Sequence, residues 1–474
     1  MSTPNPVAGR ARPRARLAAL LREAFATGEP DLTHAPIGRA VLVLAIPMVL
    51  EMAMESVFAI TDIFYVAALG AAAVAAVGLT EAIMTLVYAV AVGLGMGVTA
   101  LVARRVGEGH DEDAAQVTGQ ALWLGAATAA LVATAGVGYG EHILRLMGAD
   151  AGVIAIGTGY TRVLLGGSAT VVYIFLLNAA FRGAGQPAVA MRALALANGI
   201  NIVLDPCLIF GLGPFPELGV TGAATATTIG RGAGVVYLLV RLSRGAPHLR
   251  VRPRHLALAP AVMLGLVRVS LGGIAQFLVA TASWVVLMRL VAGFGGAAIA
   301  GYTIAIRIMD FTILPAWGLS NAAATLVGQN LGAGSVARAR AAVGVVMRWT
   351  VGCMLLVAAV FLLGAEAVAA LFAREADIVA HAADCLRLVA LGYGFFAVGL
   401  VLTQAFNGAG DTWTPTAINL ACFWALQLPL AWWLALPAGF GPRGVFGAIT
   451  VAESAVALLS WWVYRRGRWQ RVAV

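Results

Sequence analysis

The chain of 474 residues contains no lysine, so all 31 of its basic residues are arginine. This absence argues against a built-in ATP-driven motor, because a phosphate-binding P-loop uses a lysine to reach the nucleotide phosphates. Charge of either sign is scarce, since 11% of the residues are charged and soluble domains carry roughly 25%. No polar stretch is long enough to form a separate soluble domain, so most of the chain is expected to face lipid.

Apolar residues make up 61% of the chain, and the mean hydropathy is +0.89. Apolar runs of about 20 residues recur along the sequence, and each is long enough to cross a bilayer. The formal net charge is +9, which in a soluble protein would suggest nucleic acid as a partner. Here the arginines lie in the connections between apolar runs, so we expect contact with anionic lipid and no nucleic-acid partner.

The chain has 4 cysteines, all in apolar stretches, and none has metal-ligand spacing. His110 and the three acids that follow it resemble a metal site, but they come after a glycine-rich turn and are interpreted as a solvated loop. Gly93, Gly95 and Gly97 lie inside an apolar run with no preceding strand, so they predict close helix packing and not a dinucleotide loop. No grouping of His, Ser or Cys predicts an enzyme, and no cofactor is expected.

The second half of the chain repeats the first at a fixed offset of 225 residues, as in 410 − 185. The matching pairs are Gly70 and Gly295, Leu101 and Leu326, Phe181 and Phe406, Gly183 and Gly408, and Gly185 and Gly410. Two copies of one apolar unit predict an all-α integral membrane protein with about twelve transmembrane helices in two homologous six-helix lobes. A cleft between two such lobes suggests alternating access.

The domain organisation follows from the apolar runs and from one polar stretch at the midpoint. We predict a cytoplasmic N-terminal arm over residues 1–37 and a first lobe over residues 38–242. An arginine- and proline-rich linker over 243–259 precedes the second lobe and its short basic tail, 260–474. Within the lobes, 153–180 and 378–405 are each predicted as one helix.

Arginine placement predicts the orientation of the chain. Arginines concentrate in the N-terminal arm, the linker, the tail and on alternate connections, which include Arg182, whereas the opposite connections hold few. The positive-inside rule therefore puts both termini in the cytoplasm of a multi-pass protein of the cytoplasmic (inner) membrane. We expect the protein to be a monomer.

Acidic residues inside the apolar runs are the most informative polar feature. A carboxylate at the bilayer centre costs about 2.5–3.5 kcal/mol, so such residues normally face a bundle interior or a wet cavity. The first run holds Glu51, Glu55 and Asp62, whose spacings of 4 and 7 residues place them on one helical stripe. The fifth run holds Asn201 and Asp205 on one face. Asp62 and Asp205 both fall in the outer half of the bilayer and could meet inside the first lobe.

Two nearby carboxylates in a low-dielectric setting repel each other, which makes the pair a natural proton site or a cage for a sodium ion. Alternatively, Asp205 caps backbone groups near Pro206 and Asp62 only lines a cavity. For Glu51 and Glu55, a cavity for cationic substrates and a proton relay are both open. In the second lobe, Asp310 is expected to pair with Arg307, and Glu453 has no obvious partner.

At these residues the sequence resembles the multidrug and toxic compound extrusion (MATE) family, from about residue 38 to 465. Several motifs in order carry the resemblance: Ile46–Pro47 followed by Asp62 and Gly70, Asn201 to Pro206 leading into Gly219 to Thr227, Thr325 to Gly332, and Phe181 to Gly185 recurring as Phe406 to Gly410. The resemblance implies a secondary active exporter that couples the entry of a proton or sodium ion to export of amphipathic organic cations and drugs. It also suggests rocking of the two lobes, with Pro47 as a hinge in the first helix.

Among the branches of that family the chain looks most like the DinF-like one, whose coupling pocket lies in the N-terminal lobe. The positions that match this pocket are Asp62, Asn201, Asp205 and Thr227, with Tyr160 a looser match, and a bound Na⁺ would lie at Asp62 and Asp205. Phe58 stands where that branch often has a tyrosine. The candidates for the substrate cavity are Glu51, Glu55, Phe58 and Asn178. The acids of the NorM-like branch are missing around Ala280 and Phe396.

Two other classes of function compete with this interpretation. A lipid-linked oligosaccharide flippase of the same superfamily would tend to have extra helices and a strongly basic cavity. A membrane enzyme or a passive channel would need a catalytic grouping that the sequence lacks, or would not need a duplicated lobe.

Overall fold

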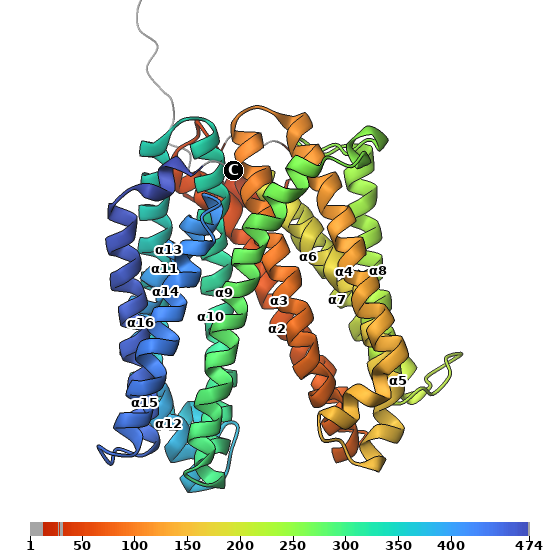
Figure 1. Cartoon of the computed structure of the whole chain (residues 1–474), viewed down its shortest axis with the longest axis vertical. Coiled ribbons are helices and arrows are strands. Elements are labelled where there is room, and N and C mark those ends of the chain that lie inside the picture. The colour runs from red at the N-terminus through yellow and green to blue at the C-terminus, as the bar shows by residue number, and fades with distance from the viewer. Residues whose placement is uncertain (1–12, 27, 29–31, 473–474) are drawn as a thin grey trace, which may run out of the picture.

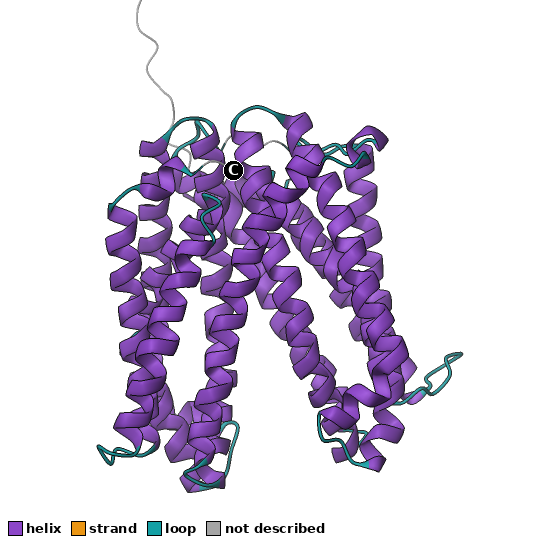
Figure 2. Ribbon diagram, in the orientation of Figure 1, coloured by secondary structure: helices purple, strands orange, loops and turns teal. Residues whose placement is uncertain are grey.

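The computed structural model describes residues 13–26, 28 and 32–472, so part of the predicted arm over residues 1–37 lies outside it. Helices form nearly all of the described chain, and Figure 2 shows no strand among these residues. The all-α prediction is confirmed. The helices of the first half are α1 (Pro13–Ala24), α2 (Ile37–Ala67), α3 (Ala71–Gly107), α4 (Asp111–Leu146), α5 (Ala151–Gly166), α6 (Ser168–Gly183), α7 (Pro187–Phe210) and α8 (Val220–Arg244).

The second half repeats this order after a short 3₁₀ turn, η1 (Pro253–Leu256). Its helices are α9 (Pro260–Ala292), α10 (Gly296–Gly332), α11 (Val336–Ala370), α12 (Ala376–Ala390), α13 (Tyr393–Gly408), α14 (Trp413–Asn419), the π-helix η2 (Leu420–Gln427), α15 (Leu428–Ala435), α16 (Pro442–Arg465) and the 3₁₀ turn η3 (Arg468–Arg471).

Eleven helices of the described chain are long and apolar enough to span a membrane, or up to twelve if the bent pair α12 and α13 forms one span. This pair bends by 60° at a short break, and its counterpart in the first half breaks between α5 and α6 at Gly167. The predicted number of spans is confirmed. The predicted spans over 153–180 and 378–405 are present, but each consists of two helices and not of one, because the helix breaks at Gly167 and at Gly392.

The internal repeat predicted from the sequence is present in the backbone. Helices α3 and α10 start and end at residues 225 apart, as in 296 − 71 and 332 − 107. The glycine before each helix has a positive φ, 98° at Gly70 and 105° at Gly295. Side chains other than glycine rarely adopt this conformation. The same turn chemistry therefore starts the second helix of both lobes.

The two lobes meet at the end that carries the C-terminus and diverge toward the opposite end (Figure 1). At the closed end α2 belongs to the second lobe, because Val41, Leu44 and Met48 share a core with residues of α10, α11 and α13. Further along, α2 joins the first lobe, where Asn198 of α7 donates a hydrogen bond to the carbonyl of Met54 (3.1 Å). In a similar way, the core of the first lobe includes Leu266 of α9. The first helix of each lobe thus crosses to the other.

Glycines allow the backbones of the lobes to touch at the closed end. A Cβ on Gly93 would lie 2.4 Å from the backbone nitrogen of Ile274, and one on Gly107 would lie 2.0 Å from the carbonyl oxygen of Gln329. The prediction that Gly93 and its neighbours serve close helix packing is confirmed. These contacts leave no room for a side chain between the lobes.

The predicted linker over 243–259 lies against α4. Gln120 donates to the carbonyl of Ala257 (2.9 Å), and Trp123 donates to the carbonyl of Leu256 (2.8 Å). Glu112 pairs with His255 (2.7 Å) and with Arg254. The interpretation of His110 to Asp113 as a solvated loop is therefore wrong in part, since Asp111 to Asp113 form the first turn of α4, and Asp111 and Glu112 pair with residues of the linker.

We expect Gly107→Ala to weaken the closed end, because the added methyl group collides with the Gln329 carbonyl across the two lobes. Spin labels at positions 147 and 371 lie in loops at the diverging end. Pulsed electron paramagnetic resonance would measure the distance between the two labels and so report the change. The substitution should shift the population toward shorter distances at that end. Gly344→Ala in α11, where a Cβ meets nothing within 4 Å, is the control. Equal distance distributions in Gly107→Ala and the parent protein would contradict the expectation.

Candidate functional site

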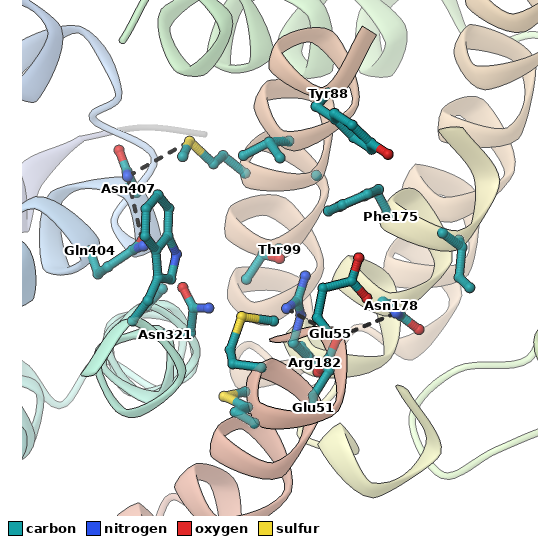
Figure 3. Close-up of a pocket in the computed structure, with 18 of the residues that line it drawn as sticks. Glu51, Glu55, Tyr88, Thr99, Phe175, Asn178, Arg182, Asn321, Gln404 and Asn407 are labelled. Atoms are coloured by element: carbon teal, nitrogen blue, oxygen red, sulfur yellow. Dashed lines mark hydrogen bonds and ion pairs between the residues drawn. The ribbon is translucent and has the colours of Figure 1, made fainter. Parts of the chain in front are cut away.

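A cavity of about 430 Å³ lies between the lobes. Every charged residue that lines it belongs to the first lobe, whereas the second lobe contributes amide, hydroxyl and apolar side chains to the described lining. The polar lining residues are Glu51, Glu55, Thr85, Tyr88, Thr99, Asn178, Arg182, Arg231, Asn321, Thr325, Gln404 and Asn407, and the aromatic ones also include Phe175, Phe277 and Trp317. Figure 3 shows Glu51, Glu55, Asn178 and Arg182 together, with Gln404 and Asn407 across the cavity.

Glu51 of α2 occupies the first of two acid–arginine pairs on the first-lobe wall. Its carboxylate lies 3.6 Å from the guanidinium of Arg182, and it accepts a hydrogen bond from the Asn178 amide (3.3 Å). The Glu51 side chain is 3% exposed, and its second oxygen, Oε2, has no hydrogen-bond partner among the described residues. Arg182 comes from the last turn of α6, directly before the Gly183–Gly185 turn. The buried carboxylate thus has a counter-charge within reach, as the low dielectric requires.

Glu55, one turn further along α2, occupies the second pair. It lies 3.5 Å from Arg231 of α8, whose side chain is 7% exposed. The Arg231 guanidinium donates to the hydroxyl of Tyr88 (3.0 Å). It also stacks over the rings of Phe58 and Tyr88, at 5.5 and 5.7 Å from their centroids. A charge, a hydroxyl and two ring faces therefore stabilise this arginine in the middle of a span.

A cluster of polar side chains lies within the first lobe at α7. The Asn201 amide donates both to Asp205 (3.2 Å) and to the hydroxyl of Thr227 on α8 (3.1 Å). Asp205 is fully buried, and within the described part of the chain neither its Oδ2 nor the side-chain carbonyl oxygen of Asn201 has a hydrogen-bond partner. The structure therefore brings Asn201, Asp205 and Thr227 into direct contact.

Asp62 lies near this cluster without joining it through a hydrogen bond. It is half-buried and interacts electrostatically with Asp205 and with Glu81 of α3. Tyr160 of α5 is buried beside Glu81, within hydrogen-bonding reach of its carboxylate. Arg231 interacts electrostatically with both Asp62 and Glu81. Asp62, Glu81 and Asp205 thus form one electrostatic network, which includes Arg231 of the cavity wall through Asp62 and Glu81.

The remaining predicted residues fall in two places. Glu51, Glu55 and Asn178 line the cavity, whereas Phe58 lies outside the lining and packs on Arg231. Pro47 is buried in α2, which continues through it from Ile37 to Ala67. A role for Pro47 as a hinge therefore remains a prediction.

Sequence reasoning missed both arginines of the cavity and Glu81. The prediction that Arg182 belongs to a connection is wrong, because Arg182 lines the cavity from the last turn of α6. Arg231 and Glu81 are charged residues inside long apolar runs. The argument that singled out the acids of the first span, that intramembrane charge is costly, applies equally to them.

The second lobe has a separate small pocket of about 40 Å³, lined in part by Asp310, Tyr393 and Glu453. Among the described residues neither Asp310 nor Glu453 has a basic group within 4.0 Å, so Asp310 and Arg307 form no close ion pair, although Arg307 interacts electrostatically with Asp310. Asp310 instead faces the pocket from α10.

Comparison with known proteins identifies a family model and relatives that match this chain. The MatE family model matches residues 47–207 and again residues 273–433, once in each half. A FAD transporter of Shewanella oneidensis is 26% identical over 408 residues, covering 84% of this chain and 88% of that protein. The probable multidrug resistance protein NorM of Thermotoga maritima is 26% identical over 452 residues, covering 92% and 94%. A crystal structure of MATE in complex with MaL6 superposes with a TM-score of 0.87 at 26% identity, covering 93% and 99%.

We expect Arg231→Met to destabilise the folded protein by about 2 kcal/mol, because it leaves Glu55 without its counter-charge and removes the Tyr88 hydrogen bond. The loss is smaller than for a fully buried pair, since Glu55 is 31% exposed. Unfolding of the purified protein in detergent would measure it. The double variant Arg231→Met with Glu55→Met should recover most of the loss, and Arg192→Gln, an exposed arginine of α7, is the control. A stability equal to that of the parent would contradict the pairing.

Proposed function

The chain belongs to the MatE family, and we propose that it is a secondary active multidrug exporter driven by the entry of a proton or a sodium ion. Members of this family are transporters and not enzymes, and the chain is a multi-pass membrane protein. The single observation that carries the proposal is Arg231, which lines the inter-lobe cavity, lies 3.5 Å from Glu55 there, and interacts electrostatically with Asp62 and Glu81 inside the first lobe. A substrate site and an ion site therefore share one charged side chain.

The coupling ion binds in the first lobe at Asp62 and Asp205, with Asn201, Thr227 and Tyr160 around them. Support comes from the free Oδ2 of Asp205 and the free carbonyl oxygen of Asn201, both buried. Oxygen atoms of this kind suit a proton or a small hard cation. The ordered contacts of Asn201 hold the carboxylate of Asp205 in place for either ion.

Arg231 transmits the state of the ion site to the cavity. When the acids of the first lobe are charged, they compete with Glu55 for the guanidinium, and Glu55 is free to bind a cationic group. When an ion neutralises those acids, Glu55 becomes the main counter-charge of Arg231 and binds a substrate less well. This exchange gives antiport, because a bound ion favours pairing of Arg231 with Glu55, whereas a bound substrate favours pairing of Arg231 with the acids of the first lobe.

Transport follows from rocking of the two lobes about the closed end, with Pro47 as the hinge in α2. Arginine asymmetry puts both termini in the cytoplasm of the inner membrane, so the diverging end faces out. Ion binding shifts the equilibrium between the two states by its differential affinity for them. A tenfold shift needs about 1.4 kcal/mol, which a difference of one pKa unit between the states supplies.

Substrates are amphipathic organic compounds that carry a cationic group. The 31% exposure of Glu55 offers a partner for that group, and Phe175, Phe277 and Trp317 offer apolar contacts. Relatives named as multidrug resistance and multidrug export proteins agree with such a substrate range. The protein acts as a monomer in lipid.

Two alternatives have different support. A lipid-linked oligosaccharide flippase would need a strongly basic cavity, and here two glutamates balance two arginines. An anionic aromatic substrate is favoured by Arg182 in the cavity wall and by the relative named as a FAD transporter. Export of a fluorescent cation and of FAD from the same vesicles would separate these possibilities.

We expect Asp62→Asn and Asp205→Asn each to abolish gradient-driven transport, because neither amide can take up the coupling ion. Uptake of a fluorescent organic cation into proteoliposomes, with a proton gradient compared against a sodium gradient, measures the effect and identifies the ion. Asp377→Asn, at an exposed position in the first turn of α12, should transport normally. Full activity in both first-lobe variants would reject the coupling site.

A further inference from the structure

We infer that the cavity selects substrates carrying one cationic and one anionic group on an aromatic body, an inference that rests on the proposed export function and narrows its substrate class. The cavity is built to receive a pair of opposite charges and not a single charge. Four charged side chains of the first-lobe wall carry this inference: Glu51, Glu55, Arg182 and Arg231.

The two acid–arginine pairs expose opposite charges to the cavity. In the first pair the arginine is the more open member, with Arg182 16% exposed and Glu51 3% exposed. In the second pair the acid is the more open member, with Glu55 31% exposed and Arg231 7% exposed. Each buried member lies behind its open partner as a counter-charge. The wall therefore presents one positive and one negative group to the cavity.

Both pairs are loose enough to accept a further partner. Their N–O separations of 3.6 and 3.5 Å exceed the roughly 2.7–2.9 Å of a charge-assisted hydrogen bond. Among the described residues the Arg182 side chain donates no hydrogen bond, although a guanidinium carries five N–H donors. A carboxylate from a substrate can therefore bind Arg182 in the planar, two-point geometry that arginine favours.

The spacing of the open charges sets the spacing of the substrate groups. Glu51 and Glu55 are one turn apart on α2, which is about 6 Å along the helix. Since Arg182 pairs with Glu51, the open positive and negative groups are separated by a similar length. Figure 3 shows Arg182 and Glu55 on the same side of the cavity.

Charge balance disfavours a substrate with only one charge. The two glutamates and two arginines of the wall sum to zero, and the second lobe adds only neutral groups such as Asn321, Gln404 and Asn407. A lone cation or a lone anion would add net charge to a weakly polar cavity at membrane depth, which costs free energy. A substrate with both charges adds none. Its aromatic body then packs against Phe175, Phe277 and Trp317.

The test uses three dyes that share one aromatic core and differ in their acidic groups. Rhodamine B carries a cationic ring and a carboxylate, its ethyl ester carries the cation alone, and sulforhodamine B carries two sulfonates and is net anionic. Fluorescence anisotropy with the purified protein in detergent, without any ion gradient, measures binding. We expect rhodamine B to bind at least about tenfold more tightly than either of the other dyes. Equal or tighter binding of the ester or of sulforhodamine B would overturn the inference.

Variants of the two open groups should change the preference in opposite directions. Arg182→Gln should remove the advantage of rhodamine B over its ester, and Glu55→Gln should shift the preference toward sulforhodamine B. Arg374→Gln and Glu375→Gln, adjacent exposed positions in the loop before α12, make the same chemical changes away from the cavity and should leave the order unchanged. A retained preference for rhodamine B in Arg182→Gln would also overturn the inference.

The double variant Arg182→Gln with Glu51→Gln guards against misfolding, because it removes the buried carboxylate together with its counter-charge. It should show the same loss of carboxylate preference as Arg182→Gln. Failure of the export hypothesis would appear separately, as full transport in Asp62→Asn and Asp205→Asn, because dye binding without a gradient does not depend on coupling.

Discussion

A charge inside a membrane protein needs a nearby counter-charge, and in this chain that requirement is concentrated on Arg231. Its guanidinium lies within a span, held by Glu55, Tyr88 and two aromatic rings. The same group acts electrostatically on Asp62 and Glu81 inside the lobe. Neutralising any one acid changes the electrostatic interaction of Arg231 with the others. Arg231 therefore links the cavity electrostatically to Asp62 and Glu81 inside the first lobe.

The packing of the closed end determines where these charged side chains lie. Backbone contacts at Gly107 and Gly318 hold α3 and α2 against α10 of the other lobe. Because α2 passes from the second lobe into the first, its acidic stripe crosses the space between them. Glu51 and Glu55 thereby line the cavity, while Asp62 reaches the first-lobe cluster on the same helix. One continuous helix, α2, therefore connects the cavity with the proposed ion site.

The fold could be predicted from the sequence to a large extent, because long apolar runs and a duplicated glycine pattern are local properties. The acids of the first span could also be predicted as important, because intramembrane carboxylates are costly. Two kinds of feature could not be. The partners of Glu51 and Glu55 come from helices more than a hundred residues away, as in 182 − 51, and helical spacing says nothing about such neighbours. The breaks at Gly167 and Gly392 were hidden because hydropathy continues across them.

The crossing of α2 has a consequence for how the chain is made. The first half of this helix, including Val41, Leu44 and Met48, packs against Leu326, Val343 and Phe406. During synthesis the first span enters the membrane long before those partners have left the ribosome. Until then these apolar residues face lipid or a chaperone. Glu51 likewise has no counter-charge until Arg182 has been made. Helix α2 thus completes its contacts only after α10, α11 and α13 have been made, so the packing of the first lobe depends on the second.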